Sequence, residues 1–443
     1  MKPSTPLSPP VGTAQLVIDP PVTVESGEVE FSARIIDPHD SEKRIWFRFP
    51  EEEASWVSRR ADPFVIATLV YAMSHYAKLE VHGTVSPGLL ANLTDFQSAY
   101  NAFHRGQLTP PMEITATVSA DSAGGPTREL GISAFSGGVD SCFTVYRHTH
   151  RSPMEPKRAL GATLMMHGFD IPVTQPEVFA RAAARSRAIT DDAKLALHTG
   201  ATNLRTLAVK WEDIYATAVA AALSFFQPRY AYGLLPSFQD WAHTKFNYGS
   251  SPLTDPMLSS LAFPIVHDGT AFGRLEKLRG LARWPAALRH LRVCWQGAEM
   301  DRNCCRCEKC VRTILMLELV GVRSAEAFPQ PLDLAQLDQL VIKGPNALEE
   351  QIYLLTEARR LGLNAPWMKP VARSIRRNAR RQQLWRTGKA IKGYMPQSVQ
   401  TALHSLGRRW LWHDRTTPVS AGEAAQPAAP AGPLAEPSSA STR

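Results

Sequence analysis

Six residues directly after an apolar run combine hydroxyl groups, adjacent glycines and a carboxylate. The run 131–135 is typical of a short buried strand, and residues 142–147 fit the helix that would follow it. Glycines let backbone N–H groups approach an anion closely, and a helix N-terminus adds partial positive charge. The segment lacks the lysine of a Walker-type loop. A phosphate-binding loop is therefore predicted, against the simpler alternative of a Gly-Gly turn. Its residues are Ser136, Gly137, Gly138, Val139, Asp140 and Ser141.

The second group of residues that could do chemistry is a cluster of cysteines. Five of the six cysteines lie within residues 294–310, and three of them follow the spacing Cys-x2-Cys-x2-Cys. Four thiolates at such spacings are typical of a closed tetrahedral zinc site. An iron–sulfur cluster and thiols without a metal are the alternatives. Cys305 is then the cysteine left over. The candidate zinc ligands are Cys294, Cys304, Cys307 and Cys310.

The loop resembles the pyrophosphate-binding Ser-Gly-Gly-x-Asp-Ser loop of the N-type ATP pyrophosphatases, the PP-loop superfamily. Loop and cysteine site together, over about residues 129–322, resemble 7-cyano-7-deazaguanine synthase-like proteins. The resemblance implies an adenine nucleotide alpha hydrolase-like fold that binds ATP, Mg²⁺ and Zn²⁺. It implies catalytic roles for Ser136, Asp140 and Ser141, with Asp140 as a partner of Mg²⁺. The chain departs from the family where Cys305 replaces a glycine.

That resemblance also implies a reaction. ATP is split to AMP and pyrophosphate, a small-molecule substrate with a carboxylate is adenylated, and a nitrogen nucleophile then displaces AMP. The enzyme would be C–N ligase-like. Sulfur or amine insertion into tRNA is an alternative within the superfamily. A non-catalytic nucleotide-binding protein on the same fold is the alternative outside enzymes.

Alternating strand and helix patterns after the loop predict the element that positions these residues. We expect strands at 162–166, 204–209 and 230–234, with helices at 175–188 and 214–226 between them. This alternation predicts an α/β fold, a parallel sheet flanked by helices on both faces. Ligands of such sheets bind at the carboxyl ends of the strands.

Polar residues near these strand ends complete the list of candidates. His167 and Asp170 follow the second strand, and Asn203 and Arg205 flank the start of the expected third strand. We expect these four residues to help bind the nucleotide. Weaker candidates follow the fourth strand or the cysteine cluster, namely Ser237, Asp240, Asp255 and Arg312.

The remaining chain is divided by composition. Residues 15–122 predict a separate N-terminal α+β domain of unknown role, and 323–413 predict a helical, basic extension. A Pro-rich leader at 1–14 and a tail at 414–443 are expected to be disordered. The leader lacks the apolar core of a signal peptide, so a reducing, cytoplasmic setting is expected.

The net charge of +8 is concentrated in one segment. Residues 366–413 contain eleven Lys and Arg and no Asp or Glu, which leaves a formal charge of −3 for the rest of the chain. Within this stretch, residues 369–392 predict an amphipathic helix. Three interpretations remain open: a site for RNA or another polyanion, contact with an anionic membrane surface, and a solvated helix. No uninterrupted apolar run is long enough to predict a transmembrane segment.

Overall fold

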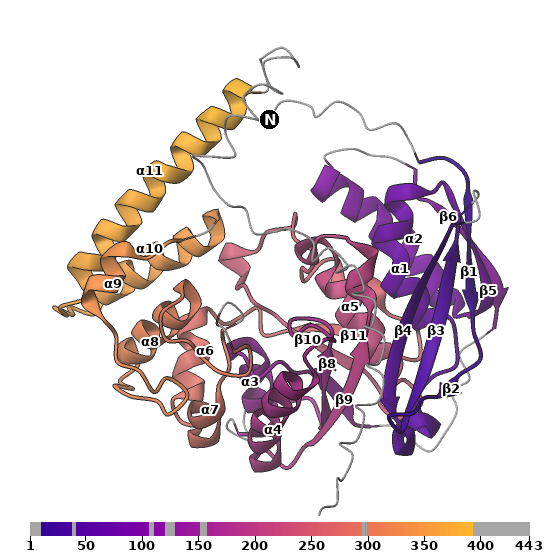
Figure 1. Ribbon diagram of the computed structural model, residues 1–443, viewed down its shortest axis with the longest axis horizontal. Helices are drawn as coiled ribbons and strands as arrows, with labels where there is room; N and C mark the ends of the chain where they lie inside the picture. The colour runs from indigo at the N-terminus through magenta and orange to yellow at the C-terminus, as the bar shows by residue number, and fades with distance from the viewer. Residues whose placement is uncertain are drawn as a thin grey trace, which may run out of the picture. The chain divides into compact units, whose positions relative to one another are not determined.

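An eleven-stranded sheet organises the part of the chain that the computed structural model describes (Figure 1). Its strands follow the order β11-β10-β7-β8-β9-β4-β3-β1-β5-β6, with β2 beside β3. The described residues are 10–37, 41–105, 110–119, 129–150, 157–294, 297, 299–342 and 344–392. Most of the predicted leader and all of the predicted tail therefore lie outside them.

Five parallel strands form the half of the sheet that carries the glycine-rich loop, which confirms the predicted α/β class with its flanking helices. Helices α3, α4 and α5 connect these strands. The strands are β7 (Gly131–Ala134), β8 (Leu160–His167), β9 (Ala196–Thr202), β10 (Gly233–Pro236) and β11 (Ile265–Asp268). The helices are α3 (Val139–Thr149), α4 (Pro176–Asp192) and α5 (Trp211–Ser224).

The expected strand at 204–209 is wrong. Residues Leu204–Leu207 form a short 3-10 helix, η3, and the third strand of this half is β9, which precedes it. Leu197 is the only large apolar side chain of β9, so the strand has little apolar pattern. Its burial comes from pairing with β8 on one side and β4 on the other. Asn203 and Arg205 consequently follow the carboxyl end of a strand instead of flanking its start.

The N-terminal segment does not form a sheet of its own. Strand β4 pairs antiparallel with β9 through Phe47–Thr202 and Arg48–Ala201, so 15–122 and 129–322 share one continuous sheet. No pattern in the sequence predicts this junction. The N-terminal elements are β1 (Thr13–Ile18), β2 (Val22–Thr23), β3 (Glu28–Ile36), β4 (Glu42–Pro50), η1 (Glu51–Trp56), α1 (Asp62–His75), β5 (Lys78–Val85), α2 (Pro87–Tyr100), η2 (Asn101–Arg105) and β6 (Glu113–Val118).

An aromatic cluster holds the two halves of the sheet together. Phe225, just after α5, lies 4.9 Å from Phe47 and 5.3 Å from Phe64, measured between ring centroids. Helix α1 is buried along almost its whole surface, and it packs on α5 over one face of the sheet. A second apolar core contains α3, α4 and the later helices. Burial of such rings stabilises the joined sheet by about 2 kcal/mol each.

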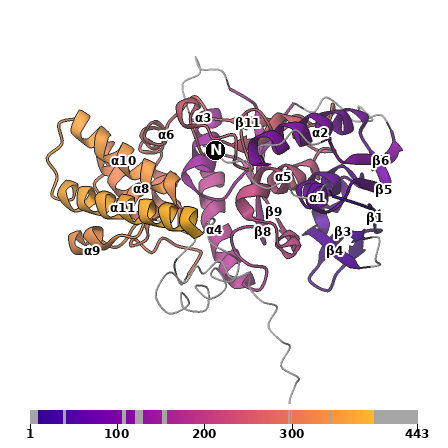
Figure 2. The same ribbon diagram turned by 90° about the horizontal axis from the view of Figure 1, so that it is seen from above.

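The chain after β11 is helical. Figure 2 shows α10 at the opposite end of the drawing from β3 and β4. No helix in the described ranges is both long and apolar enough to cross a membrane. These helices are α6 (Arg274–Leu281), α7 (Pro285–His290), α8 (Glu308–Leu319), α9 (Leu334–Gln339), α10 (Pro345–Arg360) and α11 (Met368–Lys392); the short 3-10 helices η4 (Trp241–His243) and η5 (Asp255–Leu258) precede β11.

Candidate nucleotide site and metal centre

The glycine-rich loop lies where the order of the parallel strands reverses. From β7 the chain proceeds outward to β8 and β9, and β10 then returns to the other side of β7. Because all these strands are parallel, their carboxyl ends share one edge of the sheet. A crevice outside the strand ends at such a reversal is the usual ligand site of open α/β sheets. The position of residues 135–138, between β7 and α3, therefore fits the prediction.

The loop is folded by its own hydroxyl groups. Ser141 Oγ accepts from Ser136 N at 3.2 Å and donates to Gly138 O at 3.2 Å, while Gly138 N donates to Ser136 Oγ at 3.3 Å. Gly137 has φ +72°, a conformation that favours glycine. The loop leads directly into the first turn of α3, whose N–H groups have no partner inside the helix. This arrangement can present backbone donors to an anion.

Asp140 is surrounded by cations that sequence analysis did not identify. Its carboxylate pairs with Arg274 Nη1 at 3.1 Å and with Lys277 Nζ at 3.0 Å, both from α6. Burial alone would raise the pKa of Asp140, but Arg274, Lys277 and Lys309 together hold it below its ordinary value. Burial lowers the pKa of Lys277. The same ammonium donates to Ser237 O after β10, so Lys277 joins the first turn of α3 to the end of β10.

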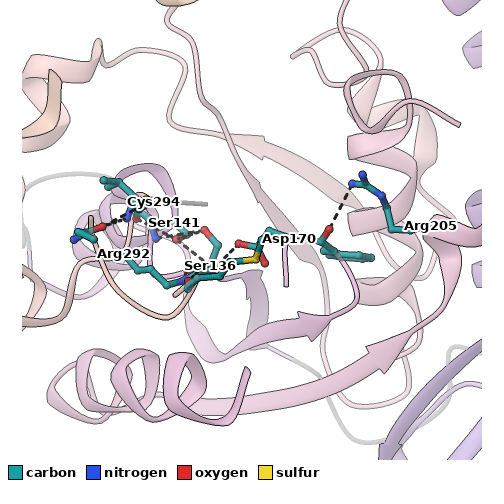
Figure 3. A network of polar contacts seen from close by, with 11 residues as sticks. Ser136, Ser141, Asp170, Arg205, Arg292 and Cys294 are labelled. Atoms are coloured by element: carbon teal, nitrogen blue, oxygen red, sulfur yellow. Dashed lines mark hydrogen bonds and ion pairs between the residues drawn. The ribbon is translucent and has the colours of Figure 1, made fainter. Parts of the chain in front are cut away.

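Arg292 holds the backbone of the loop in place (Figure 3). Its backbone N donates to Gly137 O at 2.7 Å, and its guanidinium donates to Ser136 O at 3.0 Å. The same guanidinium pairs with Asp170 at 2.6 Å and donates to Met300 O at 3.0 Å. This side chain is 3% exposed. Arg292 thus joins the loop, the end of β8 and the segment that carries the cysteines.

The structure brings Asp170 to the loop, whereas His167 contacts the turn after β8 and not the loop. His167 Nε2 donates to Pro172 O at 2.7 Å, and its ring stacks on Phe179 at 4.6 Å between centroids. Burial lowers the pKa of His167, which favours the neutral ring. In these contacts His167 supports the turn after β8, whereas Asp170 reaches the loop through Arg292.

Asn203 and Arg205 lie at the same sheet edge, one strand farther out. Asn203 Oδ1 accepts from Trp46 N at 2.8 Å and Nδ2 donates to Arg44 O at 3.0 Å, so the amide joins β9 to β4. The Arg205 guanidinium lies 5.1 Å from the centre of the Trp211 ring and donates to Phe169 O at 3.5 Å. Figure 3 shows Arg205 apart from the Ser136 loop.

The weaker candidates make contacts within the protein. Asp240 caps η4 through His243, and Ser237 Oγ donates to Gln239 O at 2.5 Å. Asp255 is fully buried and pairs with His267 at 2.7 Å. Arg312 pairs with Glu308 and, at 3.8 Å, with Glu350. Among these four, only Ser237 touches the cluster around the loop, through its carbonyl and Lys277.

The four predicted metal ligands converge as the spacing indicated. All four Sγ atoms lie within 4.8 Å of one another. Cys294 and Cys307 are 3.7 Å apart and Cys304 and Cys310 are 3.9 Å apart, measured between sulfurs. A tetrahedral ion with Zn–S bonds of about 2.3 Å separates its sulfurs by about 3.8 Å. The cluster therefore fits a metal such as zinc. Four thiolates leave no open coordination position, so such an ion would be structural.

The segment around the cysteines is held by Asn303, which sequence analysis missed. Asn303 Oδ1 accepts from Val293 N at 2.9 Å and from Cys294 N at 3.2 Å. Cys294 lies in irregular chain after α7. Cys305 is buried and is not among the converging sulfurs. Its φ of +58° is a conformation that favours glycine.

A buried carboxylate at the end of β11 also positions α3. Asp268 accepts from Thr144 Oγ1 at 3.0 Å and pairs with Arg147 at 2.6 Å and His148 at 3.1 Å. Burial alone would raise the pKa of Asp268, but His148 and then Arg147 outweigh it, so the pKa lies below its ordinary value. Because α3 begins at the loop, Asp268 helps to fix the loop's position.

We expect Asp268→Asn to lower the free energy of unfolding at pH 7 by about 3 kcal/mol, since it leaves the partly buried Arg147 guanidinium without its counter-charge. In the wild type the carboxylate stabilises the folded state above about pH 4 and loses this effect as pH falls through the lowered pKa. In urea unfolding, the difference in the free energy of unfolding between the wild type and the variant should therefore become smaller below pH 4. A difference that is the same at all pH values would contradict a stabilising role for the ionised Asp268 carboxylate.

Comparisons of the chain with models of protein families, with curated proteins and with solved structures returned no match.

Proposed function

We propose that the protein binds ATP and splits it to AMP and pyrophosphate, adenylating a carboxylate that a nitrogen nucleophile then attacks. One observation carries the proposal: Ser136–Ser141 begin a helix at the reversal point of a parallel sheet, between Lys277 and Arg292. A polyphosphate needs backbone donors and fixed positive charge, and both converge on this loop.

In this proposal the chain stabilises the leaving pyrophosphate. The first-turn N–H groups of α3 and the hydroxyls of Ser136 and Ser141 bind its oxygens. Lys277 and Arg274 neutralise the charge that develops on them, because their ammonium and guanidinium groups already lie beside the loop at Asp140. Such preorganised charge is the main contribution a protein makes to phosphoryl chemistry.

The two metals enter the proposal differently. Zinc fits the four thiolates Cys294, Cys304, Cys307 and Cys310 and supplies rigidity to the segment that carries Arg292. Mg²⁺ accompanies ATP and prefers carboxylate ligands. The Asp140 carboxylate, its expected partner, is already paired with the Arg274 guanidinium and the Lys277 ammonium.

Calorimetric titration with ATP and with pyrophosphate tests the site, with Gly138→Ala as the variant. A Cβ at Gly138 would lie 3.2 Å from Ser136 Oγ and 3.6 Å from Arg292 O, so the free protein has room for it after a small shift. The methyl group would occupy the path of a phosphate to the backbone. We expect the wild type to bind both ligands, and the variant to bind them at least tenfold more weakly with a nearly unchanged unfolding temperature.

The products distinguish the proposed reaction from its alternatives. With a panel of carboxylates and ammonia, we expect AMP and pyrophosphate, and exchange of labelled pyrophosphate into ATP. ATP binding without AMP formation would favour a non-catalytic nucleotide-binding protein. Failure of the wild type to bind millimolar ATP or pyrophosphate would contradict the proposal as a whole.

A further inference from the structure

The first half of helix α11 packs apolar and amide side chains against the rest of the protein. Val371, Ser374 and Asn378 are buried, at 2%, 1% and 3% exposure. Ser374 Oγ and Asn378 Nδ2 both donate to Leu340 O, at 3.1 and 2.8 Å, and Asn378 Oδ1 accepts from Ile342 N at 3.1 Å. These contacts determine which face of α11 points outward.

The outward face is a row of arginines. Together with Leu384 they line a shallow groove of about 480 Å³. The row comprises Arg373, Arg376, Arg377, Arg380 and Arg381. Within this row Arg373 pairs with Asp338 at 3.0 Å, and Arg377 donates to the backbone oxygens of Asp338 and Leu340.

Two members of the row are available to an outside ligand. Within the described ranges, Arg376 and Arg380 are exposed and make no ion pair or hydrogen bond with the protein. No Asp or Glu occurs anywhere in residues 366–413. Guanidinium groups form paired hydrogen bonds with phosphate oxygens, so this face is complementary to a chain of phosphates.

The row and its flank fit a strand better than a single anion. Residues 373–381 extend about 12 Å along the helix at 1.5 Å per residue, which offers contacts to successive phosphates. At the end of the row, Leu384 is 73% and Trp385 is 58% exposed. An exposed apolar side chain beside arginines, here Leu384, can contact the bases of an unpaired strand.

A membrane surface fits this face less well. A helix that lies on a bilayer inserts an apolar face, with its basic residues beside it. In α11 that face is already packed against residues 340–342, and the exposed apolar side chains among its described residues are Leu384 and Trp385. We therefore infer that the arginine face of α11, residues 373–385, binds single-stranded RNA.

The test is fluorescence anisotropy with a labelled 20-nucleotide poly-U strand, titrated with the full-length protein at several salt concentrations and without ATP. The variant is Arg376→Gln/Arg380→Gln. The control, Arg283→Gln/Arg323→Gln, removes the same charge from exposed positions outside α11. Arg376 and Arg380 make no ion pair or hydrogen bond with the rest of the described chain. The variant should therefore keep the wild-type unfolding temperature.

We expect the wild type and the control to bind RNA alike, and the variant to bind at least tenfold more weakly at low salt. Loss of two phosphate contacts should also reduce the slope of log affinity against log salt by about 1.4. Absence of RNA binding by the wild type, or equal loss in variant and control, would overturn the inference. So would binding to phosphatidylserine vesicles without binding to RNA. None of these outcomes depends on the proposed reaction with ATP.

Discussion

Replacement of any one of Cys294, Cys304, Cys307 or Cys310 by serine is expected to release a stoichiometric zinc ion and to unfold the segment around it. The free energy of binding a structural zinc is about 10–16 kcal/mol, comparable to or larger than the whole stability of a typical domain. Metal analysis of the purified wild type should therefore find about one zinc per chain. Each variant should lack it and unfold at a much lower temperature.

Cys305→Ser is the matched control, because it makes the same chemical change within the same loop. Cys305 is not one of the converging sulfurs, so this variant should keep its zinc. Loss of zinc from Cys305→Ser as well would contradict the ligand set. Stoichiometric iron with visible absorbance in protein purified without oxygen would contradict the choice of metal.

The second large effect is expected from Lys277→Gln, which should weaken the binding of ATP and of pyrophosphate by about 10- to 100-fold. The lysine side chain is 2% exposed, and its ammonium lies between the loop carboxylate and Ser237 O. A hydrogen bond between charged groups contributes about 1.5–3 kcal/mol, which corresponds to this range of affinity. Asp140 keeps Arg274 as a partner in the variant, so the loop retains part of its charge balance.

Two further variants separate binding from folding. Lys245→Gln makes the same substitution in a nearby loop, where the lysine pairs with Glu349 at 2.7 Å, and it should leave nucleotide affinity unchanged. Lys277→Arg restores the positive charge and should recover part of the affinity. Titration calorimetry and unfolding temperatures should be measured together. Unchanged pyrophosphate affinity in Lys277→Gln, with the wild type binding, would remove Lys277 from the site.

The sequence by itself determined the local features of this protein. A strand, a glycine-rich loop and a helix start occur within residues 131–149, so short-range periodicity and backbone chemistry were enough to place them. The cysteine set followed in the same way, because three of its members lie within seven residues. Helix α11 was also predicted at nearly its observed bounds, since its apolar and basic residues alternate at helical spacing.

Only the tertiary structure decided which distant residues reach the loop. Arg292 and Lys277 are separated from Asp140 by more than 130 residues in the chain, and no local pattern marks either of them. The pairing of β4 with β9 was hidden for the same reason, since β9 owes its burial to its neighbours on both sides. Asn203 has the residue type of a ligand contact, yet its amide is used to join β9 to β4. The spacing of apolar residues indicates only whether a residue belongs to a helix or a strand and which face of it is buried. The positions named here depend instead on contacts between segments that are distant in the sequence, which form only when the chain folds.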